Sequence, residues 1–466
     1  MPTIRLPYNY QPRSYQRRIY AAWQRGVRRF LLVMHRRSGK TKTLINLMPL
    51  AMQREVGNYA HVFPTLKQAK DVVWRGLDHT GFPYLGHFPA ALLGNDPNTS
   101  EARVTWYNGS TYTLYGTDRN VDALVGGNVR GVLWDEWSLQ NPLARDYTRP
   151  ILTENGGWEA ICLTPRGENH AYDLYEAVKH DPAWHVEYLT VQDTRRDAPG
   201  ESGAPVITQA AIEAERRELQ ARGEQNAEAI IQQEYYLSWQ APMPGAYYAQ
   251  QMLEAKQQGR ITSILWDPQR PVATYWDMGT SKAHDTNTIW FVQQQGNAVL
   301  LIEYYEAANY GMEHYAGVLR ERPYQYSGHW AKDGDLDVAD WGTGKTRQEI
   351  AQNFGITFRG VPEIPLVDGI NASRALLPRC VFDAERCRKG LNALRSYKRK
   401  WDEVKRTFAD HPEHDWASHG ADSFRYLAIG ISEQLDTRRE RVSRARLAFS
   451  PWDVGQERPR ARMEGR

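Results

Sequence analysis

The sequence predicts an α/β protein built from two domains. Its 466 residues exceed what a single hydrophobic core usually organises. The first half alternates short apolar runs with stretches of helical length, and the second half starts such a series again after a polar segment. This alternation favours a mostly parallel sheet flanked by helices.

The expected elements of the first half begin with FLLVM (30–34), which is short and wholly apolar, as in a buried parallel strand. The following stretch, TKTLINLMPLAMQ, predicts a helix. Three further segments repeat the strand pattern at spacings that suit α/β crossovers. They are AHVFP (60–64), GVLWDE (131–136) and AICLTP (160–165).

A linker and a small helical segment separate the halves. DTRRDAPGESGAP (193–205) is polar and rich in turn residues, and the charged stretch after it predicts one or two helices before a boundary near Pro244. Beyond the boundary we expect strands at 272–279 and 336–341, and a hairpin within 288–307 that turns at Gln295–Asn297. Helices are expected at 310–320, 384–397 and 422–434.

Composition indicates an ordinary globular protein, with 41% hydrophobic and 24% charged residues. No apolar run is long enough to span a membrane, and the first residues lack the apolar stretch of a secretory signal, so we expect a cytoplasmic protein. The three cysteines (162, 380 and 387) lack zinc-site spacing, which favours buried free thiols.

The net charge of +3 is small, but basic residues collect at the C-terminal end. From Asp436 onward nine arginines face five acidic residues. Such a tail either contacts phosphates or an acidic partner, or is a solvated, disordered end. The mixed basic and aromatic segment 393–406 leaves a similar choice between a DNA-backbone surface and a solvated helix face.

The segment HRRSGKTKT (35–43) predicts a phosphate-binding loop. It lies between an expected strand and an expected helix and ends in Gly39-Lys40-Thr41, so backbone N–H groups and a helix N-terminus would surround phosphates. Lys40 would contact the β- and γ-phosphates, and the Thr41 hydroxyl would bind Mg²⁺. The motif is incomplete, because Met34 stands where the pattern has its first glycine.

A second Gly-Lys-Thr ends GTGKT (342–346), and the acids downstream distinguish the two loops. A nucleotide hydrolase needs one acid for Mg²⁺ and one carboxylate to orient water. After the first loop GVLWDEWS supplies both, with Asp135 for the metal and Glu136 as the base, whereas nothing similar follows Lys345. The first loop is therefore the predicted ATP site.

With these motifs the chain resembles the large terminase subunit of tailed bacteriophages over nearly its whole length. The resemblance includes the Asp135–Glu136 pair, a loop that lacks its first glycine but carries arginines, and segments like NGSTY (108–112) and VDALVGG (121–127). It implies ATP binding by Arg36, Arg37, Ser38, Gly39, Lys40 and Thr41, a coupling role for Thr164 in LTPRG, and adenine recognition by Gln16. The resemblance also implies an arginine near the γ-phosphate, for which Arg103, supplied to a neighbouring subunit, competes with Arg37 in cis.

Three separated acids of the second half predict a metal-dependent nuclease. Asp277 ends ATYWD, Asp340 ends LDVAD, and Asp422 opens the expected helix DSFRYLAIG. Gathered on an RNase H-like sheet, such carboxylates hold two divalent cations that activate water and stabilise the leaving oxygen of a phosphodiester. The resemblance implies the same three positions.

Other residues compete for the last ligand. His419 lies three residues before Asp422, so both side chains can share one helix face as metal ligands. Asp415 is a further candidate, and Asp285 is an auxiliary one. Mg²⁺ is the expected cation, with Mn²⁺ as an alternative at the nuclease site.

The resulting hypothesis is a P-loop ATPase (1–192), a linker and helical subdomain (193–244), an RNase H-like nuclease (245–435) and a basic tail (436–466). ATP hydrolysis would move double-stranded DNA into a procapsid, and the nuclease would cut concatemeric DNA. The implied partners are the portal protein, a small terminase subunit and further copies of the chain in a ring of about five. The protein would act in the host cytoplasm, docked transiently on the procapsid and absent from the mature virion.

Two other function classes stay open. A helicase–nuclease of DNA repair would share the ATPase motifs but should carry a second RecA-like domain, which the sequence does not indicate. A non-catalytic capsid-assembly protein would need none of the acids. The packaging strategy, the cut-site preference and the oligomeric state of the isolated chain do not follow from the sequence.

Overall fold

The computed structural model describes residues 4–118, 124, 126–222, 227–240, 245–279, 286–339, 344–402 and 407–448. For 401–402, 407 and 433–448 only the backbone is described. The chain divides into two compact units, of which the first comprises Met1–Gln257 and Arg388–Ser418 and the second comprises Gln258–Cys387 and His419–Arg466. The functional assignment of the four predicted segments stays a prediction.

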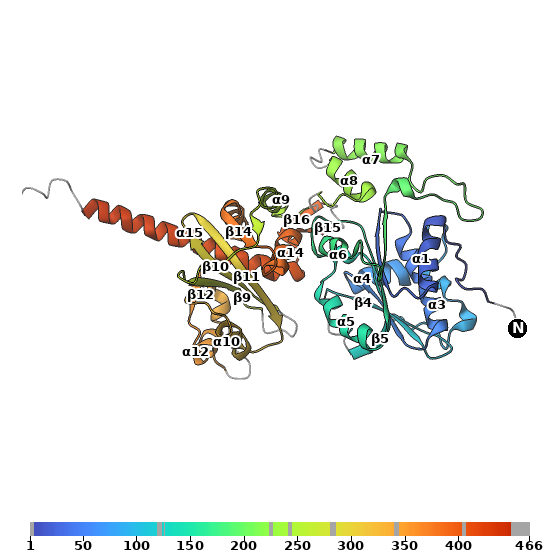
Figure 1. The fold of residues 1–466 in the computed structure, drawn as a ribbon, viewed down its shortest axis with the longest axis horizontal. Coiled ribbons are helices and arrows are strands. Elements are labelled where there is room, and N and C mark those ends of the chain that lie inside the picture. Colours follow the sequence, from blue (N-terminus) through green and yellow to red (C-terminus); the bar gives the residue numbers. More distant parts are fainter. Residues whose placement is uncertain are drawn as a thin grey trace, which may run out of the picture. The chain divides into compact units, whose positions relative to one another are not determined.

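The first unit contains a seven-stranded sheet in which every neighbouring pair is parallel except β3 with β4. The strands predicted at 30–34, 60–64, 131–136 and 160–165 are confirmed as β1, β2, β5 and β6. The predicted mostly parallel α/β fold is thereby confirmed for this unit (Figure 1). In sheet order the strands are β3 (Arg103–Thr105), β4 (Thr111–Gly116), β2 (Asn58–Phe63), β5 (Val129–Trp134), β6 (Trp158–Leu163), β1 (Arg29–Met34) and β7 (Trp184–Leu189).

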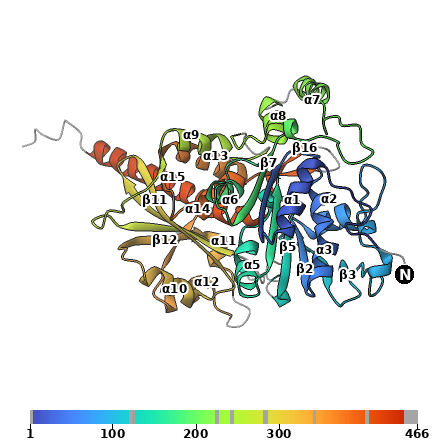
Figure 2. The ribbon, with the colours of Figure 1, turned by 45° about the vertical axis from the view of Figure 1, so that its right-hand side comes forward.

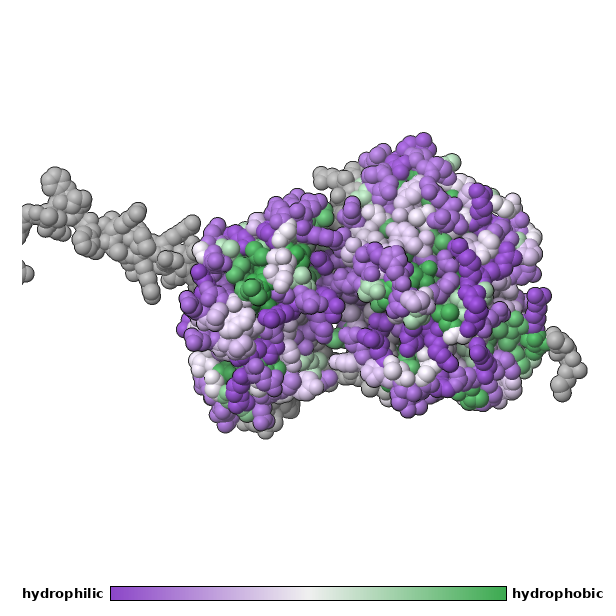
Figure 3. Space-filling model, in the orientation of Figure 1, coloured by the Kyte–Doolittle hydropathy of each residue, from purple (hydrophilic) through white to green (hydrophobic). Residues whose placement is uncertain are grey.

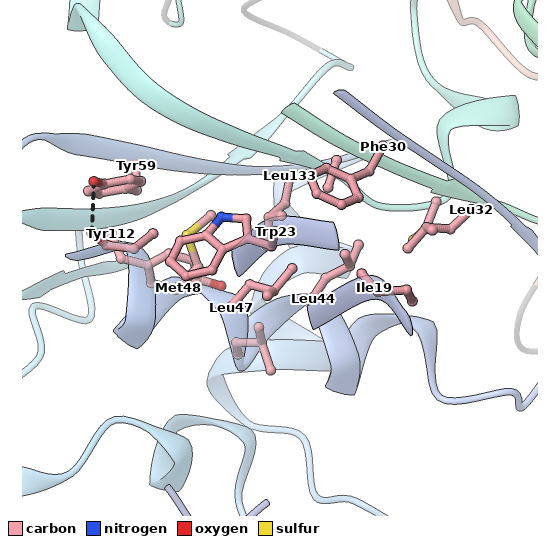
Figure 4. Close-up of a cluster of buried hydrophobic side chains, with 14 of the residues drawn as sticks. Ile19, Trp23, Phe30, Leu32, Leu44, Leu47, Met48, Tyr59, Tyr112 and Leu133 are labelled. Carbon is pink, nitrogen blue, oxygen red and sulfur yellow. Dashed lines mark hydrogen bonds between the residues drawn. The ribbon is translucent and has the colours of Figure 1, made fainter. Parts of the chain in front are cut away.

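Helices cover both faces of this sheet, because alternate residues of a strand point to opposite faces. Phe30 and Leu32 of β1 pack with α1 (Ser14–Gln24), α2 (Lys40–Ile45) and α3 (Leu47–Arg54) in the core drawn in Figure 4. Leu31 and Val33 face the other way, toward α5 (Leu143–Glu154) and α6 (His170–Val178). Each such fully buried side chain contributes about 1.5–3 kcal/mol.

The remaining elements of the first unit surround this layered core. The helical segment predicted after the linker forms two helices, α7 and α8, which lie side by side (Figures 1 and 2). The elements not yet given are α4 (Leu66–Ala69), α7 (Gln209–Ala221), α8 (Ala227–Tyr236), α9 (Ala249–Gln257), α14 (Arg388–Ser396), β15 (Arg399–Asp402) and β16 (Thr407–Pro412).

The segment from α14 to β16 is part of the first unit's packing. Tyr397, with 1% of its surface exposed, stacks on Tyr248 with ring centroids 5.8 Å apart. Asn392 of α14 donates to Asp173 of α6, and the pKa of the mostly buried Arg395 is lowered by burial. The DNA-backbone surface considered for 393–406 is therefore wrong for Tyr397, whereas Arg399 and Lys400 are exposed.

The second unit contains a seven-stranded mixed sheet. Strands β9, β10 and β11 form an antiparallel meander, and the described pairings beyond it are parallel. The predicted hairpin turn at Gln295–Asn297 is confirmed between β10 and β11. The sheet order is β13 (Phe358–Val361), β12 (Tyr326–Lys332), β9 (Val272–Asp277), β10 (Thr286–Gln295), β11 (Ala298–Ala308), β14 (Cys380–Asp383) and β8 (Ile261–Thr262).

Helices pack on both faces of this second sheet as well. Trp276 packs in a core with α10 (Met312–Arg320) and α12 (Arg347–Asn353), whereas Tyr275 approaches Gly430 of α15 (Trp416–Ala448). Figure 2 shows α10 and α12 on one side of this sheet and α15 on the other. Asp277 has the parity of Tyr275, so it faces α15. The other helices are α11 (Asp333–Leu336) and α13 (Leu366–Leu376).

The predicted strand at 336–341 is wrong over its described residues, 336–339. The strand of this region is β12, which ends at Lys332, and Leu336 closes the short helix α11. The alternating apolar residues of LDVADW are typical of a strand, and this pattern led to the wrong prediction. The strand that pairs with β9 is YSGHWAK, which contains few aliphatic residues. Asp340 therefore does not end β12, and this residue, like Asp285, lies outside the described part of the chain.

Hydrophilic residues cover most of the visible face of each unit, with small hydrophobic patches between them (Figure 3). Within the described residues, no helix is both long enough and apolar enough to cross a lipid bilayer. Cys162, Cys380 and Cys387 are buried and free, as expected.

Candidate functional site

The loop between β1 and α2 opens into a cavity of about 550 Å³ in the first unit. Arg37 and Gly39 adopt left-handed backbone conformations with φ of 67° and 86°. Met34, in place of the missing glycine, buries its side chain in the core, and its carbonyl oxygen accepts a hydrogen bond from Lys40 Nζ at 3.2 Å. The loop thus forms without a glycine at position 34.

Lys40 connects the loop to two other predicted residues. Its Nζ donates to Thr164 Oγ1 at 2.7 Å and lies 3.5 Å from Glu136 Oε1. Thr164, at the end of β6, is buried and donates in turn to the Met34 carbonyl at 3.2 Å. The structure therefore brings Lys40, Glu136 and Thr164 together at the carboxyl ends of β1, β5 and β6.

Glu136 follows β5 in the left-handed conformation, with φ 55° and ψ 46°. For a residue other than glycine this conformation costs on the order of 1–3 kcal/mol and is concentrated at functional sites. Its side chain lines the cavity, and its Oε2 is buried without a hydrogen-bond partner among the described residues. A carboxylate oxygen held in this way is available to accept a proton from water.

Asp135 is buried beneath the loop. His61 Nε2 lies 3.3 Å from its Oδ2, Cys162 Sγ donates to its Oδ1 at 3.1 Å, and the Thr41 side chain hydrogen-bonds to it. Burial alone would raise the pKa of Asp135, but these hydrogen bonds hold it below the usual range. Asp135 is therefore ionised, and its carboxylate beside the Thr41 hydroxyl offers the oxygen ligands that Mg²⁺ prefers.

His61 and Cys162 both contact Asp135. His61 was not identified as a site residue from the sequence, and Cys162 was predicted only to be a buried free thiol. They lie on β2 and β6, the two strands that flank β5. His61 is the one polar side chain inside the apolar run AHVFP, and this position could have indicated a buried polar contact. Strand order decides which carboxylate it meets, and that order was not readable from the sequence.

The other predicted ATP-site residues line the same cavity, which includes Gln16, Arg36, Arg37, Ser38, Gly39 and Thr41. Arg103 does not. It lies on the edge strand β3, where it pairs with Glu101 at 2.9 Å and donates to Thr113 at 3.3 Å. The role of Arg103 as an arginine supplied to another subunit stays a prediction. Of the two candidates for the arginine near the γ-phosphate, Arg103 and Arg37, only Arg37 lines the cavity described here.

The second Gly-Lys-Thr has a structural role in the described residues. Thr346 accepts a hydrogen bond from Glu349 N at 3.2 Å and forms a capping box at the start of α12. α12 has seven residues, and the element described before it is the helix α11 rather than a strand. The preference for the first loop therefore agrees with the geometry of both segments.

In the second unit, α15 and β9 bring three predicted residues together. His419 Nδ1 lies 2.9 Å from Asp277 Oδ2. Burial and the nearby charge of Asp277 raise the pKa of Asp422, although Arg425, 3.0 Å from the Asp422 carboxylate, opposes the shift. Asp277, His419 and Asp422 therefore form one acidic cluster.

Asp335 joins this cluster, and the sequence did not single it out. Burial and the charge of Asp277 raise the pKa of Asp335 to about 6. Asp335 follows β12, the strand that runs parallel to β9, so the two acids lie at neighbouring strand ends. Because the strand was predicted at 336–341, the sequence indicated Asp340 rather than Asp335 as the acid at its end.

The cluster has the oxygen-rich composition of a site for hard divalent cations. Burial and the charge of Asp277 raise the pKa of Asp335 and of Asp422, as expected for carboxylates that lie close together. Within the described part of the chain, however, no three His, Cys, Asp or Glu side chains are arranged to hold one ion. Asp415 directly precedes α15, in the part of the chain assigned to the first unit, and accepts a hydrogen bond from Ala417 N at 3.0 Å.

Comparisons with known proteins give no match to a family model and none to a curated protein. Among solved structures the chain is similar to the large terminase of a thermophilic bacteriophage in complex with ADP, with 15% identity over 89% of this chain and 98% of that chain and a TM-score of 0.38.

Two single-domain structures are also similar. The large terminase ATPase domain of Thermus phage P74-26 matches 50% of this chain and 99% of its own, with 16% identity and a TM-score of 0.37. The large terminase nuclease domain of bacteriophage SPP1 with bound Mn matches 35% of this chain and 91% of its own, with 14% identity and a TM-score of 0.28.

Proposed function

We propose that this protein hydrolyses ATP to move double-stranded viral DNA into a procapsid and cuts the DNA with a second, metal-dependent site. The observation that carries the proposal is the meeting of Lys40 and Glu136 in the wall of one cavity. Thr164 is hydrogen-bonded to Lys40, and Asp135 is hydrogen-bonded to Thr41. This is the residue set that nucleotide hydrolysis requires.

In the proposed reaction, Lys40 contacts the β- and γ-phosphates while the loop backbone surrounds them. A water attacks the γ-phosphorus, Glu136 accepts its proton, and the bond to the β–γ bridging oxygen breaks to release ADP and phosphate. Thr41 and Asp135 would hold Mg²⁺, which neutralises charge on the phosphate oxygens. Thr164, bonded to Lys40, would transmit the change at the γ-phosphate to β6.

In the second unit, Asp277, Asp422 and the predicted Asp340 would hold the divalent cations, with Asp335 and His419 beside them. Mg²⁺ or Mn²⁺ ions would supply an activated water and stabilise the leaving oxygen of the phosphodiester. His419, which contacts Asp277, would orient that carboxylate or join it as a ligand. Whether Asp340 or Asp335 completes the set is decided by substituting each with asparagine and measuring cleavage.

The partners belong to the same proposal. They are double-stranded DNA, a portal protein, a small terminase subunit and further copies of the chain in a ring of about five, with Arg103 offered to the neighbouring copy. The action would take place in the host cytoplasm during a transient docking on the procapsid. Contacts directed at the DNA backbone would suit movement along any sequence.

The test separates the two sites in the full-length chain. Lys40→Ala should abolish ATP turnover and leave Mn²⁺-dependent plasmid cleavage, whereas Asp277→Ala should abolish cleavage and leave ATP turnover. Lys67→Ala and Asp368→Ala change exposed residues of each unit and should affect neither activity. The proposal fails if folded Lys40→Ala and Asp277→Ala proteins retain both activities.

A further inference from the structure

A buried row of polar side chains crosses three neighbouring strands of the first sheet and ends at Asp135. In the register of the sheet, His61 of β2 lies opposite Leu114 of β4 and Leu133 of β5. Tyr112 and Asp135 stand two residues from these partners, so their side chains point to the same face as the side chain of His61. All three polar side chains are closed to solvent, with at most 1% of each residue exposed.

The two ring nitrogens of His61 have different partners. Nε2 lies 3.3 Å from Asp135 Oδ2, and Nδ1 lies 2.8 Å from Tyr112 OH. Two lone pairs would repel each other across the first contact, so a hydrogen lies between Nε2 and the carboxylate. A carboxylic acid gives up its proton more readily than an imidazolium, and this hydrogen therefore belongs to Nε2.

Tyr112 fixes this form of the histidine ring. In a neutral ring with its hydrogen on Nε2, Nδ1 is an acceptor. Burial raises the pKa of the Tyr112 phenol, so the hydroxyl keeps its hydrogen and donates it to Nδ1. The hydrogen bonds thus run in one direction, from Tyr112 to His61 and from His61 to Asp135.

The other oxygen of Asp135 is held from the opposite side. Cys162 Sγ of β6, the strand on the far side of β5, donates to Asp135 Oδ1 at 3.1 Å. With one donor on each oxygen, the carboxylate cannot rotate without losing a hydrogen bond. An ionised carboxylate has about four acceptor positions, so it keeps capacity for a cation next to Thr41.

We propose that His61 is a positioning residue of the ATP site, which orients the Asp135 carboxylate for a divalent cation, and that Tyr112 orients His61. The inference rests on the proposed function, because it takes Asp135 and Thr41 to be the Mg²⁺ ligands. Hydrogen bonds to a ligand raise metal affinity, since the ligand is already oriented before the ion binds. The described residues that line the cavity do not include His61, so its effect is on the cation requirement rather than on contact with the nucleotide.

The Mg²⁺ dependence of ATP turnover by the full-length chain tests this role. His61→Leu removes both nitrogen contacts, and we expect the Mg²⁺ concentration for half-maximal turnover to rise about 10- to 100-fold. Electron paramagnetic resonance should show the same loss in the affinity for the Mn²⁺ that binds only when a slowly hydrolysed ATP analogue is present. Binding of the analogue in EDTA should not change, because His61 does not contact it.

Conservative variants separate orientation from general stability. In His61→Gln the side-chain amide nitrogen can replace Nε2 as the donor, so the Mg²⁺ requirement should return toward the wild-type value. Tyr112→Phe removes one hydroxyl and should raise the requirement about 2- to 10-fold, the usual effect of one hydrogen bond. Tyr59→Phe is the matched control, because it removes a buried hydroxyl of β2 that donates to the carbonyl oxygens of Ala51 and Glu55 instead. This control should keep the wild-type requirement.

A wild-type Mg²⁺ requirement in a folded His61→Leu protein would overturn the inference, and so would an equal rise in Tyr59→Phe and Tyr112→Phe. If His61→Leu does not fold, the comparison of the two tyrosine variants decides alone. These outcomes would leave the proposed ATPase intact, because they are measured on chains that hydrolyse ATP. If the wild-type chain shows no Lys40-dependent turnover, the proposed function fails and this inference fails with it.

Discussion

Glu136 holds a strained backbone conformation next to Lys40, and this predicts a specific defect when its charge is removed. Glu136→Gln keeps the size of the side chain but cannot accept a proton from water. We expect kcat for ATP hydrolysis to fall by about 10²- to 10⁴-fold, the usual contribution of a general base, while ATP binding is retained. Steady-state hydrolysis and binding of a fluorescent ATP analogue measure the two effects.

The matched control is Glu154→Gln, an exposed glutamate at the end of α5, which should change neither quantity. Hydrolysis by Glu136→Gln at more than about a tenth of the wild-type rate would exclude Glu136 as the base, because a general base contributes more than this.

A buried histidine predicts sensitivity to acid. Burial lowers the pKa of His170 from 6.5 to about 4. The neutral ring therefore contributes stability that is complete above about pH 6.5 and is lost as the pH falls toward 4, where only the unfolded chain takes up the proton. The loss is at most about 1.4 kcal/mol per pH unit.

His170→Gln should therefore show a smaller drop in melting temperature between pH 7.5 and pH 5 than the wild-type chain. His180→Gln changes an exposed histidine of the same region and should keep the wild-type drop. His35 and His329 also have pKa values lowered to about 4, so the variant removes only part of the acid sensitivity. An unchanged drop in His170→Gln would contradict the assignment.

For single residues, the sequence predicted site positions where the residue type and the local motif indicate the same role, such as Lys40, Asp135 and Glu136. Residues that act through contacts between distant strands were missed. His61 reaches Asp135 because β2 lies beside β5, and Asp335 reaches Asp277 because β12 lies beside β9. Both depend on strand pairing over long sequence separations, which local patterns do not encode.

Two loops with the same three residues take different structures because of the elements around them. The first Gly-Lys-Thr connects a buried parallel strand to α2, while Thr346 of the second caps α12. We expect Thr41→Ala to abolish Mg²⁺-dependent ATP turnover. Thr346→Ala should leave turnover unchanged and cost about 1 kcal/mol of stability in the second unit, the usual value of a lost helix cap.

Turnover measured at several Mg²⁺ concentrations, together with thermal unfolding, distinguishes these outcomes. Equal loss of turnover in both variants would mean that the second loop also serves the ATP site. Strands β1, β2, β5 and β6 were predictable because each contains a short, mostly apolar run. β12 was not, because its residues Ser327, Gly328 and His329 interrupt any apolar pattern.

At the scale of the whole molecule, the chain leaves the second unit at Arg388 and re-enters it at His419. The excursion returns to the first unit and packs there through Tyr397, which lies against Tyr247 and Tyr248. The sequence did not predict this excursion, because the local sequences of α14 and β16 predict a helix and a strand but not the unit in which they pack. It is a consequence of long-range packing alone.

This packing predicts that Tyr397→Ala destabilises the first unit although the substitution lies far along the sequence. Removing a fully buried aromatic side chain costs about 3–5 kcal/mol. We expect a clear drop in the melting transition that ATP shifts, with the other transition unchanged. Tyr107→Ala removes a half-exposed tyrosine of the same unit and should have little effect. A drop confined to the transition that ATP does not shift would contradict the placement of Tyr397.

In the proposed function, one chain carries a nucleotide site and a separate cation-dependent cutting site. The most direct measurement is anomalous diffraction from crystals of the full-length protein grown with Mn²⁺ and a slowly hydrolysed ATP analogue. We expect one manganese ion between Thr41, Asp135 and the phosphates, and two more about 4 Å apart bound by Asp277 and Asp422. Manganese at the nucleotide with none bound by Asp277 or Asp422 would contradict the proposed cutting site.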